Sequence, residues 1–446
     1  MTLARYPADL TARPHAHRVL AVGAVAFVYT VVMAGGTLTI PLYVLWASQF
    51  GFGSLTTVVV FIAYVVGVVG TLLVAGSLSD AVGRRPVLAL SLTLTALSTV
   101  GFALADGLTV LLISRVLSGV ATGLITATAT SAIAELVRGR RTAAVLSTAA
   151  NVGGLSLGVV AAGVLAQCVT APTHTVFWCY LATCAVAGVS WLVIPETADR
   201  TADKTADRTA DKTADRTADG TAGRSVRWQP RIRRPVLPDG ASRVRSFVAS
   251  GVLVAASSGV NGFFSSLAPA FLRDDLGVSN FAVIGVGVGT LFISALLAQT
   301  VAPAALVRRD IGTALLAVGM IVIEAALWTH SAPLFIVGTV FAGAAVGTLF
   351  RHGLSVTDAL CHPGNRAELT ATYFLFLYSG LVVPVLVLGL ADQAVGTRAS
   401  STMLAALVVS TALVGLALGR RTESTSTPHT FSRPSTHLTP VEENHE

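Results

Sequence analysis

Charged residues are scarce in this sequence. Only 12% of its 446 residues are Asp, Glu, Lys or Arg, whereas about a quarter is usual in a soluble domain. Hydrophobic residues make up 53% of the chain, and the mean hydropathy is +0.73. This composition excludes an ordinary soluble protein and indicates a membrane protein.

Cysteine is also rare. Cys168, Cys179, Cys184 and Cys361 form no CxxC pair, and no histidine stands at a zinc-binding spacing from them. Isolated cysteines of this kind are small packing residues, because a zinc site needs clustered thiolate or imidazole ligands. The sequence therefore predicts no metal site and no cofactor.

Long apolar runs are abundant. A lipid-spanning helix needs roughly 20 mostly apolar residues, because the hydrocarbon offers no water to its backbone. Twelve such runs predict an all-α membrane protein with 12 transmembrane helices. The predicted spans are residues 19–45, 55–75, 87–105, 109–132, 143–166, 175–194, 247–272, 281–306, 313–329, 333–356, 367–391 and 402–418.

The basic residues are unevenly distributed between the loops. Of the 30 Lys and Arg residues, 26 fall in the termini and in the loops after spans 2, 4, 6, 8 and 10. Cytoplasmic loops are enriched in Lys and Arg, so we expect both termini in the cytoplasm and the chain in the plasma membrane. The net charge of +7 then reflects topology, and we predict no nucleic-acid partner.

The chain divides into two halves of six predicted spans. Between them the tetrad TADR or TADK repeats over residues 197–220, with near-zero net charge and no hydrophobic face. Such a segment cannot build a core. We predict a six-helix bundle over 1–194, a cytoplasmic linker over 195–245, a second bundle over 246–419 and a disordered cytoplasmic tail over 420–446.

The halves are similar to each other at a shift of 224 to 226 residues. The matched pairs include Gly36 with Gly262, Gly51 with Gly277, Arg84 with Arg308, Arg85 with Arg309, Gly119 with Gly343, Gly123 with Gly347, Gly154 with Gly380 and Gly163 with Gly389. Two parallel repeats can rock about a site between them, which is what alternating access requires. This symmetry favours a carrier.

The loop GSLSDAVGRRP, residues 76–86, joins predicted spans 2 and 3. Its glycines permit a tight reversal, its proline suits a helix start and its arginines fix sidedness. Asp80 is not explained in this way, since it is an acid in a basic loop. The residues that match the pattern GxLxDxxGRR are Gly76, Leu78, Asp80, Gly83, Arg84 and Arg85.

This pattern resembles the loop 2–3 signature of the major facilitator superfamily, with Ala81 where the family often has arginine. The resemblance implies two pseudo-symmetric six-helix bundles that work by alternating access. It also implies a gate in which Asp80, with Arg84 or Arg85 as its partner, holds the cytoplasmic helix ends together in the outward-facing state.

A second motif, RVLSGVATG, places Arg115 inside span 4, roughly 10 Å from its outer end. A buried arginine either snorkels to the headgroups or faces a polar cavity. The spacing of Arg115 from Gly119 and Gly123 resembles the span 4 signature of the same superfamily. That resemblance implies a role for Arg115 in proton coupling or substrate contact.

A third motif, GLSLGVVAAG, places Gly154, Gly158 and Gly163 in span 5, where they suit close helix packing. It resembles the span 5 signature of proton-driven exporters in the superfamily, with Val159 replacing a proline and Ala162 a glycine. The resemblance favours efflux.

Few ionisable side chains lie within the spans. Glu324 in span 9 is a candidate coupling acid, because a buried carboxylate can change its ionisation with the side that is open. Arg351 and His352 in span 10 are candidates for coupling, since histidine titrates near neutral pH, or anchors at the inner leaflet. Sidedness and packing explain the acids near cytoplasmic ends, which are Glu135, Asp358 and Glu368.

The predicted cavity is mixed and uncharged, with a few hydrogen-bond donors. Span 1 contains no acid, which disfavours a cationic substrate. The residues expected to line the cavity are Thr39, Tyr43, Asn151, Asn261, Tyr373 and Tyr378.

We therefore expect a monomeric transporter in the lipid bilayer that exports a small organic compound, such as an antibiotic or another amphipathic molecule, in exchange for protons. The alternative is a proton symporter that takes up a small metabolite. A membrane enzyme or sensor would need a motif such as HExxH or a soluble catalytic domain, and the sequence contains neither.

Overall fold

The computed structural model describes residues 15–75, 78–194, 235–362 and 365–424, and these residues form helices and connecting loops without a strand. Gly76, the repeat at 197–220 and most of the predicted tail lie outside the described residues.

The first half begins with a helix that is broken near its middle and continues through the sixth predicted span. Its helices are α1 (His15–Thr37), a 3-10 turn η1 (Ile40–Leu42), α2 (Tyr43–Phe50), α3 (Ser54–Ala75), α4 (Leu78–Val82), α5 (Arg84–Ala103), α6 (Leu108–Leu136), α7 (Arg140–Cys168), α8 (Pro172–Ser190) and a 3-10 turn η2 (Trp191–Val193).

The second half follows the same order of long helices. Its elements are α10 (Ala241–Ser266), α11 (Ala268–Ala270), a π-helical turn η3 (Phe271–Asp275), α12 (Phe281–Thr300), a 3-10 turn η4 (Ala304–Leu306), α13 (Arg309–Trp328), α14 (Ala332–Leu360), α15 (Arg366–Val395) and α16 (Thr397–Ser424).

Within the described chain, 11 segments are long and apolar enough to cross a membrane. They correspond to all the predicted spans except the sixth, which the structure forms as α8. This helix packs against α5 and α1 and completes the first group of six. The architecture is therefore the predicted all-α one, with 12 long helices in two bundles.

Three predicted spans are shorter or less regular than expected, each near a proline. Span 1 is broken at η1, which contains Pro41. Span 7 ends as α10 just before Pro269, and α12 ends before Pro303 instead of continuing to residue 306. Proline lacks the N–H that an α-helix needs and its ring collides with the preceding turn, so the apolar runs outlast the helices.

Glycines bring the helices of each half into close contact, and they do so in matching positions. A methyl group on Gly119 of α6 would stand 2.1 Å from the Tyr64 carbonyl oxygen of α3. One on Gly343 of α14 would stand 2.4 Å from the Leu291 carbonyl oxygen of α12. The glycines that repeat between the two halves of the sequence therefore mark equivalent contacts between helices.

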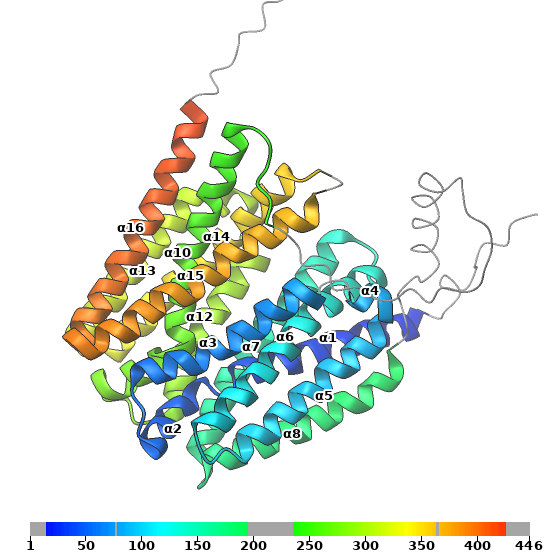
Figure 1. Cartoon of the computed structure of the whole chain (residues 1–446), viewed down its shortest axis with the longest axis vertical. Helices are drawn as coiled ribbons and strands as arrows, with labels where there is room; N and C mark the ends of the chain where they lie inside the picture. The colour runs from blue at the N-terminus through cyan, green and yellow to red at the C-terminus, as the bar shows by residue number, and fades with distance from the viewer. Residues whose placement is uncertain (1–14, 76–77, 195–234, 363–364, 425–446) are drawn as a thin grey trace, which may run out of the picture.

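Another matched pair of glycines lies between the halves. A methyl group on Gly163 of α7 would stand 2.8 Å from the Gly285 Cα of α12, and one on Gly389 of α15 would stand 3.1 Å from the Val58 side chain of α3. Figure 1 shows the two groups of helices meeting along these elements, with α3 and α7 beside α15 and α12.

The ends of the bundle differ in charge. Arginines begin α5, α7, α13 and α15, and Arg18 of α1 donates to the Leu136 carbonyl at the end of α6 at 2.6 Å. We call this the basic end, and the end that carries α2, η3 and the start of α12 the opposite end (Figure 1).

Candidate functional site

A cavity of about 440 Å³ lies between the two halves. Four helices of each half contribute to its wall, which are α1, α3, α6 and α7 from the first and α10, α12, α14 and α15 from the second. Aromatic rings make up much of the wall, among them those of Phe61, Tyr64, Phe292 and Tyr378. The cavity is thus shared between the repeats and suits an organic molecule with an apolar body.

The cavity is closed at the opposite end. There the Phe281 N–H of α12 donates to the Gln167 side chain of α7 at 2.8 Å, and the Ser54 hydroxyl of α3 donates to the Asp392 carboxylate of α15. Both bonds join one half to the other.

Toward the basic end the lining continues almost to the helix ends. The residues that extend it furthest are Thr130 of α6, Ala144 of α7, Gln299 of α12 and Leu354 of α14. The cavity therefore reaches toward the basic end and stops short of the opposite end.

Arg115 projects into this cavity from α6 and is 1% exposed. Its Nη1 donates to the Gly36 carbonyl at 3.0 Å and its Nη2 donates to the Tyr43 hydroxyl. The guanidinium carbon lies 5.0 Å from the Tyr43 ring centroid, 5.5 Å from that of Tyr64 and 5.7 Å from that of Phe102. Aromatic faces attract a desolvated cation by about 2 kcal/mol.

The charge of Arg115 is not balanced by an acid in the cavity wall. Among the described residues that line the cavity, none is Asp, Glu, Lys or His. The Nε of Arg115 is buried and has no hydrogen-bond partner. An isolated cation in a membrane-embedded cavity is costly, so the site favours an anionic or electron-rich group.

The structure thus places Arg115 in the cavity wall, and its role in coupling or substrate contact stays a prediction.

A second pocket, of about 370 Å³, lies at the opposite end. Its lining includes Tyr43 of α2, Ser54 of α3 and Arg273 with Asp274 of η3. Because Tyr43 also bonds Arg115, it stands between the central cavity and this second pocket.

Asp275 follows Asp274 in η3. Burial, and then the neighbouring Asp274, raise the pKa of Asp275.

Three of the six predicted cavity residues line the cavity, namely Asn151, Asn261 and Tyr378. The Asn151 amide donates to the Tyr29 hydroxyl at 2.7 Å. The Asn261 side-chain oxygen accepts from the Ser265 hydroxyl at 3.4 Å.

The other three predicted cavity residues lie elsewhere. Tyr43 lines the second pocket. Thr39 is fully buried beside η1 and lines neither cavity. Tyr373 is buried in a cluster with Phe247, and its hydroxyl donates to the Phe350 carbonyl at 3.0 Å. Thr39 lies in the turn between α1 and η1, while the rotation of α2 and α15 turns the side chains of Tyr43 and Tyr373 away from the cavity.

Sequence reasoning missed a row of hydroxyls on α6. Thr122, Thr126 and Thr130 all line the cavity. They follow Arg115 at a spacing of about two turns and then one turn each, which places them on one face of the helix. The Thr126 hydroxyl bonds the Thr122 carbonyl at 2.7 Å. This four-residue period was the signal that could have revealed them.

The predicted coupling residues Glu324, Arg351 and His352 do not line the cavity. Glu324 accepts from Trp328, Ser401 and Thr402 and so joins α13 to α16.

Arg351 donates to the Ala302 carbonyl at 2.8 Å, and His352 is half-buried. Each lies away from the cavity because its helix face packs against neighbouring elements of the second half. Their coupling roles stay predictions.

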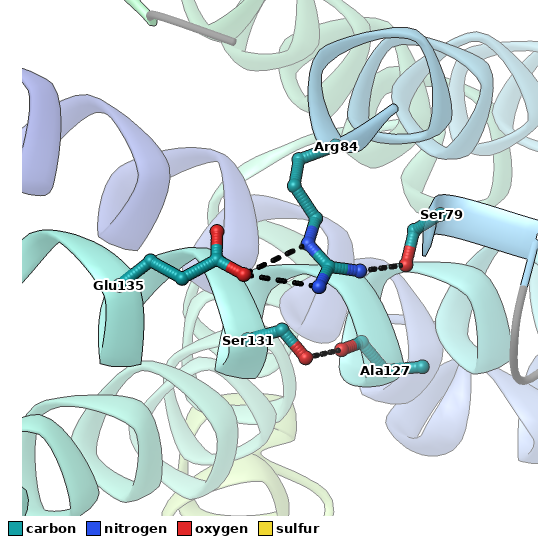
Figure 2. A network of polar contacts seen from close by, with 5 residues as sticks. All are labelled: Ser79, Arg84, Ala127, Ser131 and Glu135. Atoms are coloured by element: carbon teal, nitrogen blue, oxygen red, sulfur yellow. Dashed lines mark hydrogen bonds and ion pairs between the residues drawn. The ribbon is translucent and has the colours of Figure 1, made fainter. Parts of the chain in front are cut away.

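The segment of residues 78–86 is held to α6 through Arg84 (Figure 2). Its guanidinium bonds the Glu135 carboxylate, with Nη2 at 3.0 Å, and its Nη1 donates to the Ser79 hydroxyl at 2.5 Å. Gly83 precedes α5 with a φ of 115°, a conformation that favours glycine. The side chain of Asp80 lies outside the described residues, so its latch role stays a prediction.

Arg85 stacks on Trp191, with its guanidinium carbon 4.0 Å from the ring centroid. This contact ties the start of α5 to η2, and it explains why a second arginine suits this loop.

The predicted packing glycines all stand at close helix contacts. A methyl group on Gly123 would stand 2.7 Å from the Thr71 side chain of α3. One on Gly154 would stand 2.7 Å from the Thr30 carbonyl oxygen of α1, and one on Gly158 would stand 2.2 Å from the Ala34 carbonyl oxygen. Gly119 and Gly163 are described above.

Three solved structures share this fold. A bacterial homologue of the human lysosomal transporter Spinster, in an inward-facing and unoccupied conformation, has a TM-score of 0.70 at 14% identity, covering 92% of this chain and 99% of the other. The human organic anion transporter MFSD10 (TETRAN) has a TM-score of 0.58 at 18% identity, covering 90% and 100%. A POT family transporter in complex with 5-aminolevulinic acid has a TM-score of 0.68 at 14% identity, covering 93% and 98%.

No significant match was found among curated protein sequences. The sequence model of the Major Facilitator Superfamily matches residues 25–309, which include the loop of residues 76–86, Arg115 and the boundary between the halves. The chain belongs to the Major Facilitator Superfamily and is a multi-pass membrane transport protein.

Proposed function

We propose that the protein is a secondary active transporter that exports a small organic compound in exchange for protons. The observation that carries the proposal is the cavity between the repeats, which is closed at the opposite end and extends toward the basic end. Rocking of one half against the other would open the opposite end and close the basic end. The substrate is then released on the other side of the membrane.

The basic end faces the cytoplasm in this proposal. Arginines gather at the helix starts on that end, and cytoplasmic segments are enriched in Lys and Arg. The termini are then cytoplasmic, the membrane is the plasma membrane and a monomer suffices, because the cavity is built from one chain. The described conformation is the one that receives substrate from the cytoplasm.

The direction of transport is supported by the glycine-rich motif of α7. Gly158 and Gly163 bring α7 against α1 and α12, so this helix packs closely on both the first bundle and the second. A close glycine contact of this kind permits small rotations without an obstructing side chain. The resemblance of the motif to that of proton-driven exporters supports efflux.

Proton coupling is proposed at groups outside the cavity wall. Glu324 and His352 are the titratable candidates within the second half, while Asp80 is the proposed latch at the basic end. A proton that binds one of these groups would favour one of the two states, because each state exposes it to water differently.

The test uses everted membrane vesicles, which expose the cytoplasmic face. Respiration acidifies the vesicle interior, and a pH-sensitive dye reports the gradient while compounds from an amphipathic panel are added. A proton-coupled exporter releases protons as it concentrates its substrate inside the vesicle. The expected result is a compound-dependent loss of the gradient together with accumulation of that compound, absent from vesicles that lack the protein.

Two results would contradict the proposal in different ways. A compound that leaves preloaded vesicles together with protons would identify a symporter for uptake. Accumulation that persists after a protonophore collapses the gradient would show that protons do not drive transport.

A further inference from the structure

We propose that the substrate is an organic anion, and that its carboxylate or similar acidic group binds the guanidinium of Arg115 in the central cavity. This inference rests on the proposed function and specifies its substrate class. It is carried by the unpartnered Nε of Arg115 and by the charge of the cavity wall.

The charge of the wall is positive. Arg115 is the one formally charged side chain among the described residues that line the cavity. The surrounding walls are apolar or aromatic, so little solvent screens the guanidinium and its attraction for an anion is strong. A cationic substrate would meet repulsion and would find no carboxylate on the described wall.

The geometry of Arg115 leaves one edge for a ligand. Nη1 is engaged by the Gly36 carbonyl and Nη2 by the Tyr43 hydroxyl, while Nε is buried without a hydrogen-bond partner. An arginine fork presents Nε and Nη2 on the same side. A carboxylate that accepts from Nε would therefore lie next to Tyr43 and could share Nη2 with its hydroxyl.

The position of Tyr43 connects binding with the route through the protein. Tyr43 lines the second pocket at the opposite end and bonds Arg115, which lines the central cavity. An anion at the Nε edge competes with the phenol for the guanidinium. Binding at this edge would thus loosen the contact that separates the two spaces.

The rest of the wall suits an apolar body. Phe61 and Tyr64 stand on the first half, and Phe292 and Tyr378 stand on the second half. The volume of about 440 Å³ accommodates a two-ring molecule. The recognised ligand is therefore an amphipathic anion with its acidic group at Arg115.

The experiment compares three probes of similar shape and different charge. They are 1-naphthylacetate, 1-naphthaleneethanol and 1-naphthylethylamine, and equilibrium dialysis measures their binding to the purified full chain in lipid nanodiscs. We expect the carboxylate to bind at least tenfold more tightly than the alcohol and the amine to bind most weakly. Arg115→Gln should abolish the preference for the carboxylate, whereas Arg115→Lys should retain part of it.

Two controls separate a charge effect from misfolding. Arg366→Gln removes the same charge from an exposed side chain paired with Asp358 at the basic end, and it should bind all three probes as the unaltered chain does. Arg115→Gln should bind the neutral alcohol with unchanged affinity, which reports an intact cavity.

The inference is overturned if the alcohol or the amine binds as tightly as the carboxylate, if none of the probes binds, or if Arg115→Gln keeps the carboxylate preference. Failure of the proposed function gives a different result. The carboxylate would then bind through Arg115 and yet would not be carried into everted vesicles under an imposed pH gradient.

Discussion

The two halves share their packing but differ in their charge. Gly119 on α6 and Gly343 on α14 stand at equivalent helix contacts. At the position that matches Arg115, the second half has Thr339, whose buried hydroxyl bonds the Phe335 carbonyl at 2.8 Å. The repeat therefore preserves how closely helices approach, while the fully buried charge among the described residues, Arg115, belongs to the first half.

This difference gives the halves separate tasks. A symmetric frame is needed for rocking, since both bundles must form equivalent contacts in the two states. Under the proposed mode of binding, the single charge of Arg115 makes the cavity asymmetric, because the anion would be held mainly by the first half. At the basic end the two halves differ similarly, with Arg84 of the first half joined to Glu135 on another helix and Arg308 of the second half joined to its near neighbour Asp310.

The largest expected effect is at the unequal position. Arg115→Gln should reduce the initial transport rate in proteoliposomes about tenfold to a hundredfold, which corresponds to a lost charge-assisted hydrogen bond. Thr339→Ala, the matched change in the second half, should alter the rate less than about twofold, because its hydroxyl bonds its own helix. Equal losses from both variants would show that the halves contribute alike.

The next effect tests the shared packing. Gly119→Ala and Gly343→Ala should each lower stability by about 1–3 kcal/mol, because the added methyl group meets a backbone carbonyl. Melting in detergent, followed by fluorescence or light scattering, measures this loss. Gly70→Ala is the control, since a methyl group there meets nothing within 4 Å, and it should stabilise its helix slightly. A loss confined to one half would contradict the equivalence of the two contacts.

A smaller effect is expected at the basic end. Glu135→Gln removes the ion pair with Arg84, whose side chain is 11% exposed, and should lower stability by about 1 kcal/mol or less. For a domain of about 150–250 residues, a loss of about 1 kcal/mol lowers the melting temperature by about 2–4 °C. Asp310→Asn should change it less, because its nearer arginine partner, Arg308 at 2.8 Å, is 63% exposed and Arg309 lies 3.5 Å away.

A double-mutant cycle isolates the ion pair at the basic end. The double variant, Arg84→Gln with Glu135→Gln, should lose less stability than the sum of the losses in the two single variants. Each single variant removes one charge of the pair and leaves the other in place. Strict additivity would mean that the pair does not hold the segment of residues 78–86 to α6.

The sequence predicted the fold well because its signals are local. Twenty-residue apolar runs and glycines at a constant shift require no knowledge of tertiary contacts. The same signals could not predict the breaks at Pro41 and Pro303, since hydropathy continues through a proline that ends a helix.

The candidate site was predicted less completely. Arg115 stood out because a charge within a span is rare, whereas its partner Tyr43 is 72 positions away and the contact depends on how the helices pack. Tyr373 was expected in the cavity and is instead buried against the Phe350 carbonyl. Which face of a helix turns inward changes by about 100° per residue, so composition alone could not orient it.

The smallest expected effect lies at the opposite end, where the second half carries Asp275 and the matching loop of the first half carries no acid. Burial and the neighbouring Asp274 raise the pKa of Asp275 in the folded protein. A carboxyl group with a raised pKa stabilises the fold below its unfolded pKa of about 4, and this stability is lost as the pH rises through the folded value. Asp275→Asn should therefore melt at a slightly higher temperature than the unaltered chain at pH 7.

The advantage of Asp275→Asn should disappear below about pH 3, where the carboxyl group is largely protonated in both states. The matched change in the first half, Gln49→Glu, should create little pH dependence, because Gln49 is exposed and has Ser48 where the second half has Asp274, although Gly51 and Gly277 both have a φ of 66°. If the Asn variant gained stability equally at both pH values, the effect would come from the amide and not from the charge. Of these two positions, Arg115 and Asp275, the halves would then differ electrostatically at Arg115 alone.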